Sequence, residues 1–158
     1  MPSAAMARAL AAGDKAPPIA LADQNGSVRR SDQLGGKALV LFFYPKDDTP
    51  GCTMEACAFR DSYADLQAMG AEVWGVSGDD AASHQRFAAR HNLPYPLLVD
   101  RGNGLRKAFG VPAVLGLLPG RVTYVIDSEG VIRHVFNNLL DGPAHRREAI
   151  EALRQLQA

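Results

Sequence analysis

The chain has 158 residues, the length of one domain, and can bury about 70% of its unfolded surface without the help of disulfides or a metal. Seventeen basic residues balance seventeen acidic ones, which argues against a nucleic-acid or anionic-membrane partner because both require a basic face. No apolar stretch approaches the ~20 residues of a membrane helix. We therefore expect a cytoplasmic protein, with a plastid protein that has lost its leader as the alternative.

The N-terminal part of the chain predicts a leader followed by strands. We expect residues 1–12 to be a flexible leader and residues 13–158 to form a single domain. The segment 21–28 predicts a short β-hairpin, with Asn25-Gly26 as its turn. The continuous apolar run 38–44 is typical of a central strand that is buried on both faces.

After residue 45, strands alternate with helices. In chain order the pattern predicts a helix over 50–69 that stops at Gly70, a strand over 73–77, a helix capped by Asp79 or Asp80 that ends near Arg90, a strand over 97–99, a short helix over 105–109, an irregular loop over 110–120, a hairpin with strands 122–126 and 131–136, and a last helix capped by Asp141 with Ile150, Leu153 and Leu156 on one face. Alternation favours a parallel core, and the terminal hairpin adds antiparallel strands. We therefore predict an α/β sandwich with a central mixed sheet flanked by helices.

The sharpest chemical signal is Cys52, which lies where a buried strand ends and a helix begins. Thr49 is a favoured N-cap residue and Pro50 suits the first helical position, so Cys52 falls in the first turn. Unpaired backbone N–H groups and the helix dipole favour a thiolate there. A thiolate attacks a peroxide oxygen and becomes sulfenic acid. The competing interpretation is a buried, inert cysteine.

The second cysteine, Cys57, is separated from Cys52 by four residues, so the pair is not a Cys-x-x-Cys redox motif. The two cysteines also lack the suitably spaced histidine pair of a zinc site. On one helix their Cα atoms would lie about 8–9 Å apart, whereas a disulfide needs less than about 7 Å. A bond between them therefore requires the helix to unwind, and the alternative is that Cys57 is a buried helix-face residue.

These residues resemble a known family. Pro45-x-x-x-Thr49-x-x-Cys52 matches the active-site signature of the peroxiredoxins. The longer segment 43–57 is similar to the peroxiredoxin Q / bacterioferritin comigratory protein branch, and residues 118–127 resemble its plant and cyanobacterial members. The resemblance implies a thioredoxin-like fold with peroxiredoxin additions, and reduction of hydrogen peroxide and organic hydroperoxides.

The resemblance also implies roles for individual residues. Cys52 would be the peroxidatic cysteine, and Arg121 would hold it as a thiolate and polarise the peroxide. Thr49 would hydrogen-bond the peroxide and the sulfur, Pro45 would shield the pocket from water, and Glu55 would orient the arginine. Backbone N–H groups near Cys52 would complete an anion cradle. The supporting positions next to these residues are Tyr44 and Gly51.

Cys57 matches the resolving position of many members of this branch, so the resemblance implies an intrachain disulfide, with an external thiol as the alternative. It further implies recycling by thioredoxin or a similar dithiol donor, no cofactor or metal, and commonly a monomer, with a weak dimer as the alternative. A disulfide oxidoreductase and a redox-controlled holdase are the competing functions. The apolar loop 114–118 could expose leucines to alkyl hydroperoxides or a partner, or pack against the core.

Simpler interpretations compete with several of these assignments. Spacing alone favours a solvated strand-edge charge for Arg121, and Glu55 could be a first-turn acid that suits the helix dipole. Asp47 and Asp48 are expected to be loop charges that point away from Cys52. The four histidines are expected to make surface or local hydrogen bonds; they are His84, His91, His134 and His145.

Overall fold

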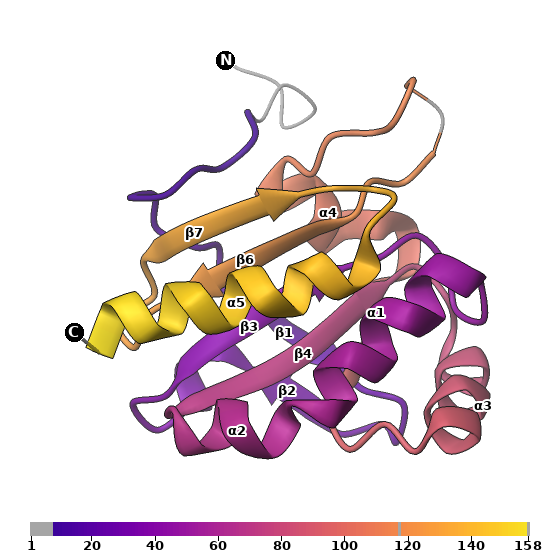
Figure 1. The fold of residues 1–158 in the computed structure, drawn as a ribbon. Helices are drawn as coiled ribbons and strands as arrows, with labels where there is room; N and C mark the ends of the chain where they lie inside the picture. The colour runs from indigo at the N-terminus through magenta and orange to yellow at the C-terminus, as the bar shows by residue number, and fades with distance from the viewer. Residues whose placement is uncertain (1–7, 117, 158) are drawn as a thin grey trace.

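The computed structural model describes residues 8–116 and 118–157 (Figure 1). In chain order its elements are β1 (Ala20–Ala22), β2 (Val28–Arg30), a 3₁₀ turn (Ser31–Gln33), β3 (Ala38–Phe43), α1 (Pro50–Asp61), α2 (Tyr63–Ala68), β4 (Ala71–Ser77), α3 (Ala81–His91), β5 (Leu97–Val99), a second 3₁₀ turn (Arg101–Asn103), α4 (Gly104–Phe109), β6 (Val122–Ile126), β7 (Ile132–Asn137) and α5 (Gly142–Gln157). None of these helices is both long and apolar enough to cross a membrane.

A five-stranded mixed sheet forms the centre of the molecule, in the order β5-β4-β3-β6-β7. The strand β3 is parallel to β4 and antiparallel to β6. The edge strands are β5, which is parallel to β4, and β7, which is antiparallel to β6. In Figure 1, α1 and α5 lie side by side across the sheet. This arrangement confirms the predicted α/β fold with a central mixed sheet.

The middle strand is buried on both faces, as its continuous apolar run predicts. Val40 and Phe42 belong to the cluster that also contains residues of α1, α3 and α5. Leu39, Leu41 and Phe43 belong to the cluster on the opposite face, which includes Phe109 of α4. Because both faces are packed, the end of β3 and the loop that follows it have a fixed position from which α1 begins.

The predicted helix over 50–69 is wrong in one respect, because the structure divides it at Ser62. The backbone N–H of Ser62 is shared between the carbonyls of Ala58 and Phe59, and its backbone leaves the helical region. The side-chain hydroxyl accepts a hydrogen bond from Arg146 of α5 at 3.1 Å. The break therefore lets α1 pack on α5 and lets α2 turn to pack on β4.

Several predicted boundaries also shift. The predicted N-terminal hairpin is present, but its strands, 20–22 and 28–30, extend beyond the predicted segment 21–28 at both ends. The Asp23 carboxylate accepts hydrogen bonds from the N–H groups of Asn25 and Ser27 and so closes the turn. The strand β4 begins at Ala71, two residues early. Of the three residues predicted to share one face of α5, Leu153 is buried and Leu156 is 40% exposed.

The hydrogen bonds of two aspartate side chains identify the N-caps of α3 and α5. Asp80 caps α3 by accepting from the Ser83 N–H at 2.8 Å, so the choice between Asp79 and Asp80 falls on Asp80. Asp141 accepts from the Ala144 N–H at 3.0 Å and caps α5, as predicted.

Part of the segment expected to be a leader, residues 1–7, lies outside the described residues. The part from residue 8 onward makes defined contacts with the domain. The Leu10 N–H donates to the carbonyl of Phe109 at 3.1 Å, and the Gly13 N–H donates to the carbonyl of Ile132 at 2.7 Å.

Candidate active site

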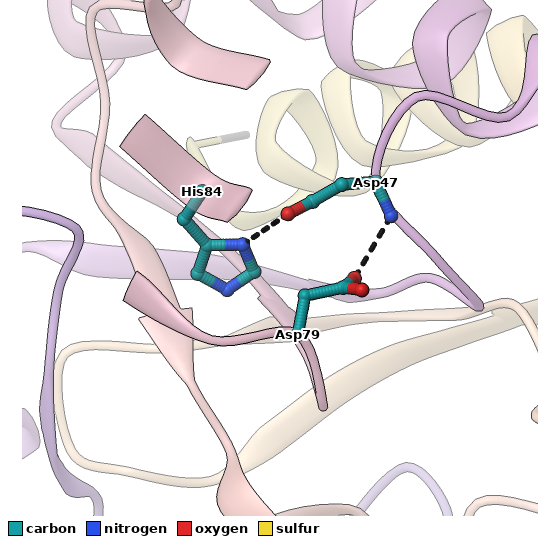
Figure 2. A group of neighbouring side chains, drawn as sticks. All are labelled: Asp47, Asp79 and His84. Carbon is teal, nitrogen blue, oxygen red and sulfur yellow. Dashed lines mark hydrogen bonds and ion pairs between the residues drawn. The ribbon is translucent and has the colours of Figure 1, made fainter. Parts of the chain in front are cut away.

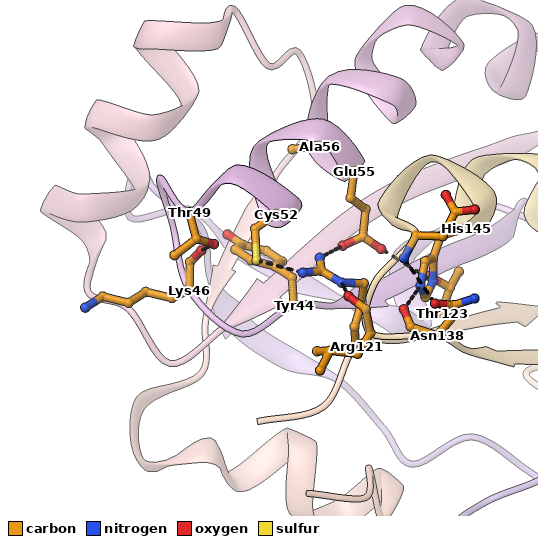
Figure 3. A network of polar contacts seen from close by, with 12 residues as sticks. Tyr44, Lys46, Thr49, Cys52, Glu55, Ala56, Arg121, Thr123, Asn138 and His145 are labelled. Atoms are coloured by element: carbon orange, nitrogen blue, oxygen red, sulfur yellow. Dashed lines mark hydrogen bonds and ion pairs between the residues drawn. The ribbon is translucent and has the colours of Figure 1, made fainter. Parts of the chain in front are cut away.

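Cys52 lies in the first turn of α1, directly after the loop that leaves β3 (Figure 3). Its side chain is only 1% exposed and belongs to the core cluster on the helix side of the sheet. Pro50 opens the helix, as the sequence predicts. The sulfur is therefore held at a helix N-terminus, where backbone N–H groups lack helical partners and a negative charge is favoured.

The expected side-chain cap at Thr49 is absent. Thr49 has the extended backbone of an N-cap residue, but its hydroxyl donates to the carbonyl of Lys46 at 2.9 Å and accepts nothing from α1. The hydroxyl thus closes the loop that precedes the helix. Pro45, in the same loop, is half-buried.

Arg121 connects three parts of the site. Its Nη2 donates to the Cys52 sulfur at 3.4 Å, its Nη1 donates to Glu55 Oε1 at 2.7 Å, and its Nε donates to the Leu139 carbonyl at 2.9 Å. The residue is 4% exposed, so the interpretation of Arg121 as a solvated strand-edge charge is wrong. A Cβ on Gly51 would lie 3.0 Å from Nη2, so glycine at this position leaves room for the guanidinium beside Cys52.

Glu55 lies one turn after Cys52 and is fully buried. The simpler interpretation of Glu55, as a first-turn acid that only suits the helix dipole, is wrong because Glu55 lies beyond the first turn and accepts from Arg121. Burial raises the pKa of Glu55 from 4.5 to about 8, because desolvation outweighs the opposing attraction of Arg121. The carboxyl group therefore keeps its proton up to about pH 8, well above the pH at which an exposed glutamate ionises.

Sequence reasoning did not assign His145 of α5 to this site. Its Nε2 faces the Asn138 carbonyl at 2.8 Å, and its Nδ1 faces the Thr123 hydroxyl at 2.8 Å. The same Nδ1 lies 3.4 Å from Glu55 Oε2 (Figure 3). Burial, above all, lowers the pKa of His145 to about 4, so its ring is neutral at pH 7. The expectation of a surface position is therefore wrong for His145, which is buried, whereas its contact with Asn138 is the local hydrogen bond that was the other expectation.

Gly142 explains how α5 brings His145 so close to α1. A Cβ at this position would lie 2.8 Å from the Gly51 carbonyl oxygen and 2.9 Å from the Glu55 Cβ. Only glycine therefore permits this approach of the two helices without a shift. The glycine beside the predicted cap Asp141 was a possible signal, but sequence alone does not reveal which helix it approaches.

A second buried arginine, Arg106 of α4, was also missed. Its two terminal nitrogens donate to the carbonyls of Gly120 and Tyr44, at 2.6 and 2.7 Å. It therefore joins the loop that follows β3 to the residue that precedes Arg121. Burial lowers the pKa of Arg106, against the opposing attraction of Asp100 and Cys52.

Asp47 and His84 form a buried pair beside the site (Figure 2). Asp47 accepts from the Tyr44 hydroxyl at 2.6 Å and faces His84 Nδ1 at 2.6 Å, while its N–H donates to Asp79. Burial lowers the pKa of His84, but the hydrogen bond and charge of Asp47 outweigh it, so the net pKa is raised. Asp47 lies in the loop as expected, with its carboxylate on Tyr44 and His84, but it is buried and fixes the loop before Cys52 to α3.

These contacts place Tyr44 in the core, with its hydroxyl directed at Asp47.

Cys57 lies on the same helix as Cys52 and is half-buried. The thiols of Cys52 and Cys57 are both free. In the apolar loop, Leu115 and Leu118 are exposed, while Leu117 lies outside the described residues.

The pKa of Glu55 predicts a pH effect on stability. The native chain keeps a proton that the unfolded chain releases between about pH 4.5 and pH 8, so the stabilisation from this group is complete at low pH and is lost as pH rises through that window. Relative to Glu55→Gln, the wild-type free energy of unfolding is expected to fall with rising pH, by at most ~1.4 kcal/mol per unit. Urea unfolding of both proteins at about pH 5, 6.5 and 8 measures this difference. A difference that does not change with pH would contradict it.

Comparison with known proteins gives consistent matches. The model of the AhpC/TSA family matches residues 12–135. Peroxiredoxin Q, chloroplastic, of Oryza sativa subsp. japonica is 49% identical over 145 residues, which are 91% of this chain and 67% of the relative. The corresponding protein of Triticum aestivum has the same identity and coverage.

Solved structures agree with the sequence matches. Peroxidoxin BcpB of Mycobacterium tuberculosis has a TM-score of 0.86 at 36% identity, over 94% of this chain and 99% of that one. The bacterioferritin comigratory protein of Xanthomonas campestris, for which an alkyl peroxide reduction activity is described, has a TM-score of 0.80 at 28% identity, over 89% and 92% of the two chains. The fold is therefore the thioredoxin-like fold of such proteins.

Proposed function

The chain belongs to the AhpC/TSA family and is a thiol peroxidase, and we propose that Cys52 is its attacking thiolate and Cys57 its resolving thiol. The observation that carries this proposal is the 3.4 Å contact between Arg121 Nη2 and the Cys52 sulfur, in the first turn of α1. A fixed cation and a helix N-terminus both favour the thiolate, which is the nucleophilic form.

In the first step, the Cys52 sulfur attacks the outer oxygen of the hydroperoxide. An S–O bond forms and the O–O bond breaks, so Cys52 becomes sulfenic acid and the alcohol or water leaves after taking one proton. Arg121 donates toward the oxygen that develops negative charge. The Thr49 hydroxyl, which is already fixed by Lys46 through its proton, offers its lone pairs to the peroxide O–H.

In the second step, the Cys57 thiol attacks the sulfenic sulfur, a disulfide forms and water leaves. Because both cysteines lie on α1, the helix must open between them. Glu55, which contacts Arg121, lies in this segment. A dithiol donor of the thioredoxin type then reduces the disulfide.

We predict that disulfide formation unwinds the start of α1. Backbone amides 52–57 should lose exchange protection in the verified disulfide form, relative to the reduced form, because the geometry of an intact helix forbids the bond. Hydrogen exchange read by mass spectrometry measures this. The amides of α5 serve as the internal control, and equal protection of 52–57 in both forms would contradict the prediction.

The substrate is proposed to include organic hydroperoxides besides hydrogen peroxide. The exposed Leu115 and Leu118 precede Arg121 closely in the chain and support an apolar approach to the site.

The relatives from rice and wheat are chloroplastic, which supports a plastid location over a cytoplasmic one.

Replacement of Cys57 by Ser tests the proposed cycle. The variant should consume one equivalent of peroxide at a rate near that of the wild type, then recycle at least about tenfold more slowly with thioredoxin, thioredoxin reductase and NADPH, because the disulfide that the donor attacks cannot form. Rapid-mixing and steady-state assays measure the two rates. Full steady-state turnover in Cys57→Ser would contradict the role of Cys57 as resolving thiol.

A further inference from the structure

Tyr95, which lies between α3 and β5, makes a buried hydrogen bond to the helix that carries both cysteines. Its hydroxyl donates to the carbonyl oxygen of Ala56 at 2.7 Å, and both residues are buried. Among the residues that the structure describes, this carbonyl is the only hydrogen-bond partner of the Tyr95 hydroxyl. Burial raises the pKa of Tyr95 well above its usual value, so the hydroxyl keeps its proton and remains a donor.

The Tyr95 side chain is held in place by neighbours outside α1. Its ring packs against the rings of Phe42 on β3 and Tyr63 on α2, and each pair of ring centroids is 5.8 Å apart. The Gln24 side chain accepts from the Leu97 N–H at 2.8 Å and donates to the Tyr95 carbonyl at 3.4 Å. The N-terminal hairpin thereby fixes the backbone around Tyr95, and the position of the hydroxyl does not depend on α1.

The Ala56 carbonyl belongs to the segment that the proposed cycle must rearrange (Figure 3). It is part of the peptide bond that joins Ala56 to Cys57. Five residues along a helix correspond to about 140° around its axis, so Cys52 and Cys57 face different sides of α1. To turn Cys57 toward Cys52, this peptide bond must also turn. Formation of the disulfide is therefore expected to break the Tyr95 hydrogen bond.

A second contact holds α1 beyond this segment. Arg60 Nη1 donates to the carbonyl of His91, at the end of α3, at 2.8 Å. Because Arg60 follows Cys57 by three residues, this contact can stay in place while residues 52–57 open. Of the two contacts that join α1 to the segment 91–95, the one from Tyr95 lies in the part that must open.

We propose that the hydrogen bond from Tyr95 to Ala56 slows the opening of α1 and so limits the rate at which Cys57 reaches the sulfenic acid on Cys52. This inference rests on the proposed roles of the two cysteines. A buried hydroxyl that loses its acceptor raises the free energy of the open state, so the hydrogen bond favours the closed helix. Tyr95 is then a positioning residue, because it acts through the backbone beside Cys57.

The lifetime of the sulfenic acid decides which of two reactions follows. The Cys57 thiol attacks the sulfenic sulfur, which gives a disulfide and water. A second hydroperoxide instead oxidises the sulfenic acid to sulfinic acid, and the alcohol or water leaves. Slow opening of α1 prolongs the sulfenic acid and favours the second reaction. The Tyr95 hydroxyl thereby sets the sensitivity of this chain to excess peroxide.

The first measurement uses the reduced protein without peroxide, so it does not depend on which cysteine reacts. Tyr95→Phe removes the hydroxyl and keeps the ring. Backbone amides 54–60 of the variant should exchange about three- to tenfold faster than those of the wild type, the range expected for the loss of one hydrogen bond. The amides of α5 are the internal control and should change less. An equal change in α1 and α5 would overturn the proposal, because it would show only a general loss of stability, and so would unchanged exchange in α1.

Tyr63→Phe is the matched control variant. Tyr63 is an aromatic neighbour of Tyr95, but its hydroxyl donates to Glu72 on β4 and not to α1. Exchange of amides 54–60 should be the same in Tyr63→Phe and in the wild type. Equally fast exchange in both variants would overturn the specific role of the Tyr95 hydroxyl.

The second measurement follows the oxidised states after peroxide is added. Rapid quenching, thiol alkylation and mass spectrometry give the amounts of sulfenic acid, disulfide and sulfinic acid. Tyr95→Phe should react with the first peroxide at the wild-type rate but form the Cys52–Cys57 disulfide about three- to tenfold faster. With excess peroxide it should yield correspondingly less sulfinic acid, a shift that a merely structural role would not produce. Equal or slower disulfide formation in Tyr95→Phe would overturn the proposal.

Failure of the proposed cycle would be seen separately. A wild type that forms no Cys52–Cys57 disulfide would refute the proposed role of Cys57. The exchange comparison would still decide whether the Tyr95 hydroxyl restrains α1.

Discussion

Replacement of Cys52 by Ser is expected to abolish peroxide reduction, with a fall in rate of at least about 10⁴-fold. A serine hydroxyl in the same place stays protonated near neutral pH, so neither Arg121 nor the helix N-terminus can make it a useful nucleophile. The side chain is buried and close in shape to cysteine, so the fold should survive. Peroxide consumption in the absence and presence of a dithiol donor measures the loss.

The matched control is Cys57→Ser, because it makes the same substitution on the same helix at a half-buried position. It should retain the first reaction with peroxide. If Cys52→Ser consumed peroxide at the wild-type rate, or if Cys57→Ser were the variant that failed to react even once, the assignment of the two cysteines would be wrong.

Arg121→Lys is expected to lower the rate of the first oxidation by about 10²–10³-fold. Lysine keeps the charge but has one nitrogen in place of three, so it cannot reach Cys52, Glu55 and the Leu139 carbonyl together. The loss should fall on kcat/KM for the peroxide and on the fraction of Cys52 present as thiolate, which its ultraviolet absorbance reports.

Arg133→Lys is the control, since Arg133 pairs with Asp127 on the exposed terminal hairpin and is remote in the chain from α1. Its peroxidase rate should stay within about twofold of the wild type, as surface ion pairs contribute little. A wild-type rate in Arg121→Lys would contradict the prediction, because it would show that one positive charge is sufficient without the three contacts of the guanidinium group.

Much of the fold could be predicted from local patterns, for reasons that β3 illustrates. Its apolar run is continuous because both faces are packed, and the run ends where the loop to α1 begins. The break at Ser62 could not be predicted in the same way. It depends on α1 and α2 packing against different elements and on a hydrogen bond from Arg146, 84 residues away in the chain.

The residues of the site also differ in whether their neighbours in sequence could predict their positions. The position of Cys52 in a first turn follows from neighbours in sequence, Thr49 and Pro50. The contacts of Glu55 with Arg121 and His145 join α1 to two distant segments. The sequence alone favoured a solvent-exposed Arg121, and only the family resemblance predicted otherwise; nothing local indicated that Gly142 lets α5 bring His145 to Glu55.

The most direct test of the central claim is to locate the first oxidised sulfur. The reduced protein is given one equivalent of hydrogen peroxide in the presence of a reagent that traps sulfenic acid, and peptide mass spectrometry then reads Cys52 and Cys57 separately. Modification is predicted at Cys52, in both the wild type and the Cys57→Ser variant, and its rate should fall in Arg121→Lys. Trapping at Cys57 with Cys52 unmodified would contradict the account.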